Sequence, residues 1–257
     1  MLASRRATLA ATALVVLAAC DSGGDPTRPA QRDARARVVH LVPDGPLLDF
    51  RINDALRDPQ RALGYGAVVD YTNLPAQTTV VTAQQAPSTN RDTPVPLLTS
   101  SRIDLVAGLD YSFVVTGRVT APAVTETPTF TVYADTNTAP PAGTARVRVL
   151  HASPDAGGVD VYLLPPGTTT IAAGTAPTVP GIAFRSRRVV TPTAGSYAVI
   201  VTAVGERTVV LARRDNVAIV AGSGVTVALR GFVGVPIGQV PVEQQLGLQF
   251  LVDRAAP

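Results

Sequence analysis

Apolar and polar residues alternate with a period of two along most of the chain, a pattern that is typical of β-strands. In residues 146–151 (RVRVLH), Val147, Val149 and His151 fall on one face of a strand and the two arginines on the other. No helical period persists, so we expect an all-β fold of immunoglobulin-like antiparallel β-sandwiches. Runs rich in Val and Thr predict further strands at residues 78–83, 103–106, 111–119, 129–133, 158–164, 196–204, 208–212 and 224–233.

Two long stretches lack this alternation, at residues 84–101 and 168–184. Long loops on a rigid sandwich often carry binding sites, whereas segments rich in Pro, Thr and Ser are often insertions without a role. The sequence leaves both interpretations open.

One motif, R-V-x-H-x-x-P-D-x-x-x-x-D, occurs twice in the chain and contains its only two histidines. The offset between the copies is 111 residues (151 − 40 = 111), and a glycine at 117 recurs at 231 with an offset of 114 (231 − 117 = 114). A repeat of this length indicates two copies of one domain. The motif lies at Arg37, Val38, His40, Pro43, Asp44 and Asp49, and again at Arg148, Val149, His151, Pro154, Asp155 and Asp160.

We therefore expect a first sandwich domain at residues 35–135 and a second at residues 145–257. Each is about a hundred residues long, which is enough to bury a core of its own. The Pro-rich segment 136–144 (TNTAPPAGT) is expected to act as a short, fairly stiff spacer between them.

The first twenty residues have the three parts of an export signal. Arg5 and Arg6 are followed by an apolar stretch at residues 7–17, too short to span a bilayer, and then by L-A-A-C ending at Cys20. This ending resembles the lipobox of bacterial lipoproteins. By that resemblance residues 1–19 are removed, and Cys20 carries the lipid that anchors the chain in the cell envelope.

Residues 20–34 are polar and rich in Gly and Pro, which predicts a flexible tether after the lipid. Asp21 resembles an inner-membrane retention signal of some bacteria, and the choice between inner and outer membrane stays open. Cys20 is the only cysteine, so an intramolecular disulfide and a cysteine nucleophile are both excluded.

The pI of about 9.4 does not by itself indicate a nucleic-acid binder. All 22 basic residues are Arg, and removal of Arg5 and Arg6 leaves a balance of 20 − 19 = +1. Nucleic-acid binders concentrate basic residues on one face beside stacking aromatics, whereas these arginines are scattered and aromatic residues make up 5% of the chain. We expect no nucleic-acid partner. The absence of Trp also argues against a sugar-binding platform.

The repeated histidine and aspartates are the candidate functional residues. One His with two carboxylates is a plausible ligand set for a divalent cation or a proton-transfer pair. The candidates are His40, Asp44 and Asp49 in the first copy and His151, Asp155 and Asp160 in the second.

A structural interpretation of these residues is favoured over the functional one. His151 shares a face with Val149 and points towards the core, where the adjacent turn satisfies its ring nitrogens. An Asp in a Pro-Asp turn bonds its own backbone, and Asp160 is expected to face away from the apolar side of its strand. The sequence holds no G-x-S-x-G, H-E-x-x-H, Walker A or dinucleotide-binding motif. We therefore expect no enzyme activity, no catalytic residues, no metal and no cofactor.

Residues 145–162 (ARVRVLHASPDAGGVDVY) resemble the start of the bacterial domain of unknown function 4397, in which H-A-S-P-D precedes V-D-V-Y. Residues 107–117 (AGLDYSFVVTG) are similar to a later strand of that domain, while residues 34–50 keep only H-x-x-P-D. The resemblance covers nearly everything after residue 34. It implies an exported protein, anchored in a membrane or cell wall and often with tandem domains, and it implies no activity.

Taken together, these features predict a membrane-anchored envelope protein with a non-enzymatic binding or structural role. Its partner is the membrane, through the lipid, together with an envelope protein or a polysaccharide. Three alternatives stay open: a carbohydrate or cell-wall binder, a metal or hydrolytic site at the repeated motif, and an architectural spacer whose neighbours associate through edge strands.

Overall fold

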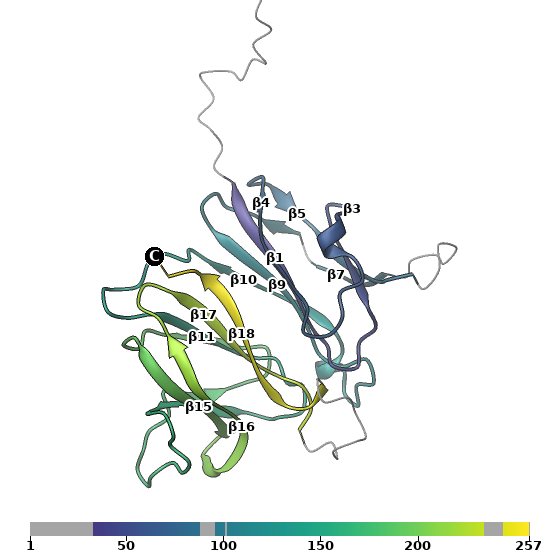
Figure 1. The fold of residues 1–257 in the computed structure, drawn as a ribbon. Helices are drawn as coiled ribbons and strands as arrows, with labels where there is room; N and C mark the ends of the chain where they lie inside the picture. The colour runs from purple at the N-terminus through teal and green to yellow at the C-terminus, as the bar shows by residue number, and fades with distance from the viewer. Residues whose placement is uncertain (1–32, 88–95, 101, 234–243, 257) are drawn as a thin grey trace, which may run out of the picture. The chain divides into compact units, whose positions relative to one another are not determined.

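β-strands form every regular element longer than three residues in the described part of the computed structural model (Figure 1). The predicted all-β sandwich fold is thus confirmed. Within the same part, no helix is long and apolar enough to cross a bilayer. The structure describes residues 33–87, 96–100, 102–233 and 244–256. The signal peptide, Cys20 and almost the whole tether therefore lie outside the described residues.

The N-terminal lobe consists of the sheets built from residues 34–135. Its core lies between the two four-stranded sheets and is centred on Phe50 and Phe113, both fully buried. One sheet has the order β10-β9-β1-β4, with β1 (Ala34–Leu41), β4 (Val68–Leu74), β9 (Asp110–Thr116) and β10 (Thr129–Asp135). The other has the order β3-β2-β6-β7, with β2 (Leu48–Ile52), β3 (Ala55–Leu56), β6 (Val81–Gln85) and β7 (Pro96–Thr99). A third, two-stranded sheet pairs β5 (Thr78–Thr79) with β8 (Ile103–Asp104), and two 3-10 turns lie at η1 (Asp58–Gln60) and η2 (Val124–Glu126).

The C-terminal lobe consists of two four-stranded sheets from residues 146–254. Its core is aliphatic and includes Val149, Val161, Ile182 and Leu229. One sheet has the order β14-β11-β17-β18, with β11 (Arg146–His151), β14 (Arg187–Val190), β17 (Gly224–Arg230) and β18 (Gly247–Arg254). The other has the order β13-β12-β15-β16, with β12 (Val159–Leu164), β13 (Val179–Ile182), β15 (Gly195–Ala203) and β16 (Glu206–Ile219).

Each lobe contains one parallel strand pair, which the sequence did not predict; the other pairs among the described strands are antiparallel. In the N-terminal lobe β1 runs parallel to β9, with Arg35 opposite Asp110. In the C-terminal lobe β11 runs parallel to β17, with Arg146 opposite Gly224. These partners differ by 111 (146 − 35) and 114 (224 − 110), the two offsets of the sequence repeat.

β1 and β9 are buried on both faces, apart from Arg35. One face packs on the core of the N-terminal lobe, and the other joins a separate cluster that contains residues of both lobes. Residues Arg32–Pro257 accordingly form one compact unit. The predicted domain boundaries stay a prediction. The segment 136–144 is more than a spacer, because Asn137 within it is buried and bonds Asp110 and Arg148.

Candidate functional site

The two histidines of the repeated motif are fully buried and hold equivalent turns. A carbonyl oxygen only accepts, so His40 Nε2 donates to Pro46 O at 3.1 Å, while its Nδ1 accepts the Val42 N–H at 3.3 Å. His151 Nε2 donates to Gly157 O at 2.5 Å. Both acceptors stand six residues after the histidine. Each ring therefore fixes the same turn of its own lobe.

The first aspartate of each motif binds a distant loop and not only its own turn. Asp44 accepts the Val119 N–H at 2.8 Å and the Thr120 N–H at 3.0 Å. Asp155 accepts the Val233 N–H at 3.1 Å. Val119 and Val233 are 114 residues apart (233 − 119 = 114), so the two contacts are equivalent. The predicted turn role extends to the loops that follow β9 and β17.

The second aspartate of each motif holds a residue in the left-handed backbone region. Asp49 Oδ1 accepts the N–H of Ala62, whose φ is +48°, at 2.7 Å. Asp160 Oδ1 accepts the N–H of Gly181, whose φ is +57°, at 2.7 Å, and its Oδ2 accepts the Gly205 N–H at 2.8 Å. Asp160 is also buried, because the face away from the core of its lobe is covered too.

The polar side chains of each motif copy therefore hold backbone segments of their own lobe in place. Burial alone would raise the pKa of Asp44, but the hydrogen bonds from Thr120 and Val119 lower it overall. Within the described ranges, no group of three or more His, Cys, Asp and Glu is placed to hold a metal ion.

Burial lowers the pKa of His40 and of His151 below the ordinary 6.5, against the opposing hydrogen bonds to Pro46 and Gly157 and the charge of Asp155. At a pH between the two pKa values, the imidazole of the unfolded chain is already protonated, whereas the buried imidazole of the folded chain is still neutral. Folding stability is therefore expected to fall as the pH drops below about 6.5, by at most about 1.4 kcal/mol per pH unit for each histidine.

Denaturant titrations between pH 7.5 and pH 5 measure this loss of stability. The carboxyl groups of Asp44 and Asp135, whose pKa is lowered, titrate below this window. A His40→Gln/His151→Gln chain should be less stable at every pH but should show a flatter slope. An unchanged slope in that variant would contradict the assignment to the histidines.

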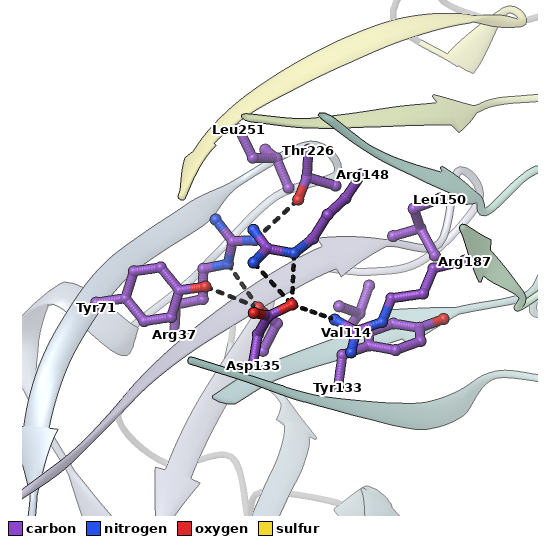
Figure 2. Close-up of a pocket in the computed structure, with 11 residues that line it drawn as sticks. Arg37, Tyr71, Val114, Tyr133, Asp135, Arg148, Leu150, Arg187, Thr226 and Leu251 are labelled. Atoms are coloured by element: carbon purple, nitrogen blue, oxygen red, sulfur yellow. Dashed lines mark hydrogen bonds and ion pairs between the residues drawn. The ribbon is translucent and has the colours of Figure 1, made fainter. Parts of the chain in front are cut away.

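A second group of polar residues, named here the Arg–Asp cluster, joins the lobes and consists of Arg37, Arg148, Asp135 and Asp253. Arg37 donates to Asp253 at 2.6 Å, and Arg148 donates to Asp253 at 2.5 Å and to Asp135 at 2.8 Å. The Asp253 side chain is fully buried and those of both arginines are 4% exposed. Figure 2 shows Arg37 and Arg148 converging from the two lobes above Asp135. Burial alone would lower the pKa of Arg148, but the charges of Asp253 and Asp135 raise it.

Apolar side chains lie beside the Arg–Asp cluster, of which Asp135 stays 19% exposed. They lie on the faces of β1, β9, β11, β17 and β18 that point away from the two lobe cores. This interlobe cluster consists of Val39, Leu41, Val114, Leu150, Ala152, Ala228 and Leu251, with Val68 and Tyr133 packed against it. Burial raises the pKa of the Tyr133 hydroxyl to about 12, and this hydroxyl donates to Arg185 O at 2.8 Å.

The pocket drawn in Figure 2 lies beside the Arg–Asp cluster. Tyr71, Ser112 and Arg187 contribute to its lining together with three members of the cluster. Its free space of about 20 Å³ is room for about one water molecule. Ser112 already accepts a hydrogen bond from Arg37 at 2.8 Å, on the neighbouring strand of the N-terminal lobe.

The sequence reasoning missed the Arg–Asp cluster, although one signal for it was present. The alternation in residues 146–151 puts Arg146 and Arg148 on the face opposite Val147 and Val149. Leu150 lies on the same face, and a strand that is apolar on both sides is typically buried on both sides.

Comparisons with known proteins give the following similarities. The family model described as "Domain of unknown function (DUF4397)" matches residues 34–162, which is 129 of the 257 residues (162 − 34 + 1 = 129). A solved carbohydrate-binding module, CBMbc of family CBM26 from Eubacterium rectale Amy13K in complex with maltoheptaose, is similar over 88% of this chain and 98% of that chain. The identity is 10% and the TM-score 0.25, which is too low to carry a ligand over. No curated protein matches the sequence.

Proposed function

Since the chain belongs to the DUF4397 family, we propose that it is a non-catalytic, membrane-anchored envelope protein with two copies of the family's domain. The two lobes form a rigid scaffold, and residues 20–34 tether this scaffold to the lipid on Cys20. The family model ends at residue 162, just after the second copy of the motif, so the second domain belongs to the proposal.

The proposed non-catalytic role is supported by the hydrogen bonds that the motif side chains make in both lobes. His40 and His151 hold equivalent turns, and Asp49 and Asp160 hold equivalent left-handed residues. A catalytic or metal-binding set needs lone pairs and protons directed at a ligand. Here most of these atoms are directed at backbone groups of the lobe itself, although His151 Nδ1 is buried without a hydrogen-bond partner among the described residues. These contacts support a structural role for the motif.

The equivalent strand registers support the second copy of the domain. The parallel pairs β1/β9 and β11/β17 keep the two offsets of the sequence repeat. Gly117 and Gly231, which match in the sequence, also adopt matching φ values of +122° and +95°. The proposed envelope-protein or polysaccharide partner rests on the sequence and stays a prediction.

Anchoring is tested by mass spectrometry of the mature N-terminus, with the full-length chain expressed in a bacterial host. We expect the wild-type N-terminal peptide to begin at Cys20 and to carry lipid, since the thiol accepts the lipid before cleavage. Cys20→Ser should lose the lipid mass and leave the membrane fraction, whereas the control Ser22→Ala should keep both. An unlipidated wild-type chain in the soluble fraction would contradict the proposed anchor.

A further inference from the structure

The ion pairs between the lobes are reciprocal. Arg37 of the N-terminal lobe binds Asp253 of the C-terminal lobe, and Arg148 of the C-terminal lobe binds Asp135 of the N-terminal lobe. The two arginines differ by 111 residues (148 − 37), and the two aspartates by 118 (253 − 135). Each aspartate occupies the penultimate or last position of an edge strand, β18 or β10, in its sheet. Equivalent positions therefore exchange partners across the interface.

The contacts at one end of the interface are reciprocal as well. Gly66 and Arg185 are equivalent, because each N–H donates to the carbonyl oxygen of its own motif histidine at 2.8 Å. Gln249 on β18 donates to Gly66 O at 2.7 Å, and Tyr133 on β10 donates to Arg185 O at 2.8 Å. Each lobe thus offers the same carbonyl oxygen to a side chain from the edge strand of the other lobe.

The apolar part of the interface follows the same rule. Val39 and Leu150 differ by 111 residues, and Val114 and Ala228 differ by 114; all four lie in the interlobe cluster. Two surfaces whose residue i contacts j while j contacts i form an isologous interface, the arrangement of twofold-symmetric homodimers. The interface between the two lobes of this chain is reciprocal in the same way, although the side chains at its equivalent positions differ chemically.

We infer that the face formed by β1, β9 and β10 is a dimerisation surface. Within one chain this face packs against the face formed by β11, β17 and β18. In a dimer it packs against the β11, β17 and β18 face of a second copy of the chain. Two molecules exchange lobes, and each interlobe contact then forms between chains instead of within one. Only the connector has to change its path, since the interface itself is the same. The inference concerns association and does not depend on lipid anchoring.

The connector between Thr138 and Gly143 decides which pairing forms. Within one chain it keeps the second lobe at a high effective concentration, which favours the monomer. Deleting residues 139–142 removes about 13 Å of maximal reach. A connector that is too short for pairing within the chain favours exchange.

The first test compares the full-length Cys20→Ser chain with the same chain lacking residues 139–142, by light scattering after size exclusion. We expect the shortened chain to elute as a dimer of twice the monomer mass. A control with four Gly and Ser residues inserted after Ala142 should stay monomeric. A folded but monomeric shortened chain would overturn the inference.

The second test needs no deletion and decides the matter if the shortened chain fails to fold. Two differently tagged copies of the Cys20→Ser chain are refolded together at high concentration, and doubly tagged dimers are captured. Their fraction should rise with protein concentration and should be lost in Leu150→Asp, which places a charge in the interlobe cluster. Exclusively singly tagged monomers, or dimers that Leu150→Asp leaves intact, would refute exchange through this face.

Discussion

Replacement of Asp253 by alanine is expected to destabilise the protein by about 3–5 kcal/mol, the range found when one partner of a buried ion pair is removed. The Asp253 carboxylate accepts hydrogen bonds from Arg37, Arg148 and Thr226, and its side chain is fully buried. Without it, Arg37 loses its carboxylate partner and stays buried. Unfolding in urea, followed by circular dichroism, measures the change.

Asp215→Ala is the matched control for this prediction. Asp215 also pairs with an arginine, Arg213 at 2.5 Å, but the pair lies near the surface with side chains 38% and 26% exposed. Exposed ion pairs contribute about 0–1 kcal/mol because water and salt screen them. If Asp253→Ala costs no more than Asp215→Ala, the Arg–Asp cluster does not hold the lobes together.

Gly117→Ala is expected to destabilise the protein by about 3 kcal/mol or more, through backbone strain together with a steric clash. The φ of Gly117 is +122°, and a Cβ there would lie 2.6 Å from the carbonyl oxygens of Glu126 and Thr127. These are backbone atoms and cannot rotate away. The loop after β9, which Asp44 also binds, would have to shift. Thermal unfolding of the full chain measures the loss.

Gly108→Ala separates the clash from the strain. Gly108 also has a positive φ, +79°, but nothing lies within 4 Å of the position of its Cβ. Only the cost of a left-handed alanine then remains, about 1–2 kcal/mol. Equal losses for the two variants would show that the close approach at Gly117 is unimportant.

Five of the eight described strands of the C-terminal lobe were predicted at least in part, because they contain regular alternations, whereas β13, β14 and β18 were not predicted. Residues 146–151 form β11 as predicted, and 158–164 matches β12 within one residue. β14 was missed because RRVV is too short and too basic to stand out from a loop. β13 lies inside the stretch 168–184 that was predicted to be irregular. Such edge strands are defined by their hydrogen-bonded neighbours more than by their own pattern.

The candidate site was found by repetition, and its role was only partly predictable. Repetition singled out His151 and Asp155, and turn chemistry favoured a structural role for both. The partner of Asp155, the Val233 N–H, is 78 residues away, so no local rule could identify it. The Arg–Asp cluster needed the pairing of two lobes, which sequence periodicity does not encode. Asp135 and Asp253 also lie outside the motif.

We expect the Arg–Asp cluster and the interlobe cluster to make the compact unit Arg32–Pro257 unfold cooperatively. Native-state hydrogen exchange of the β1 and β11 amides tests it most directly, with wild type and Asp253→Ala compared in the full-length Cys20→Ser chain. We expect one common opening free energy for both strands in wild type, and a lower opening free energy in both strands of the variant. Separate opening free energies, with β1 unaffected by a substitution in the C-terminal lobe, would contradict it.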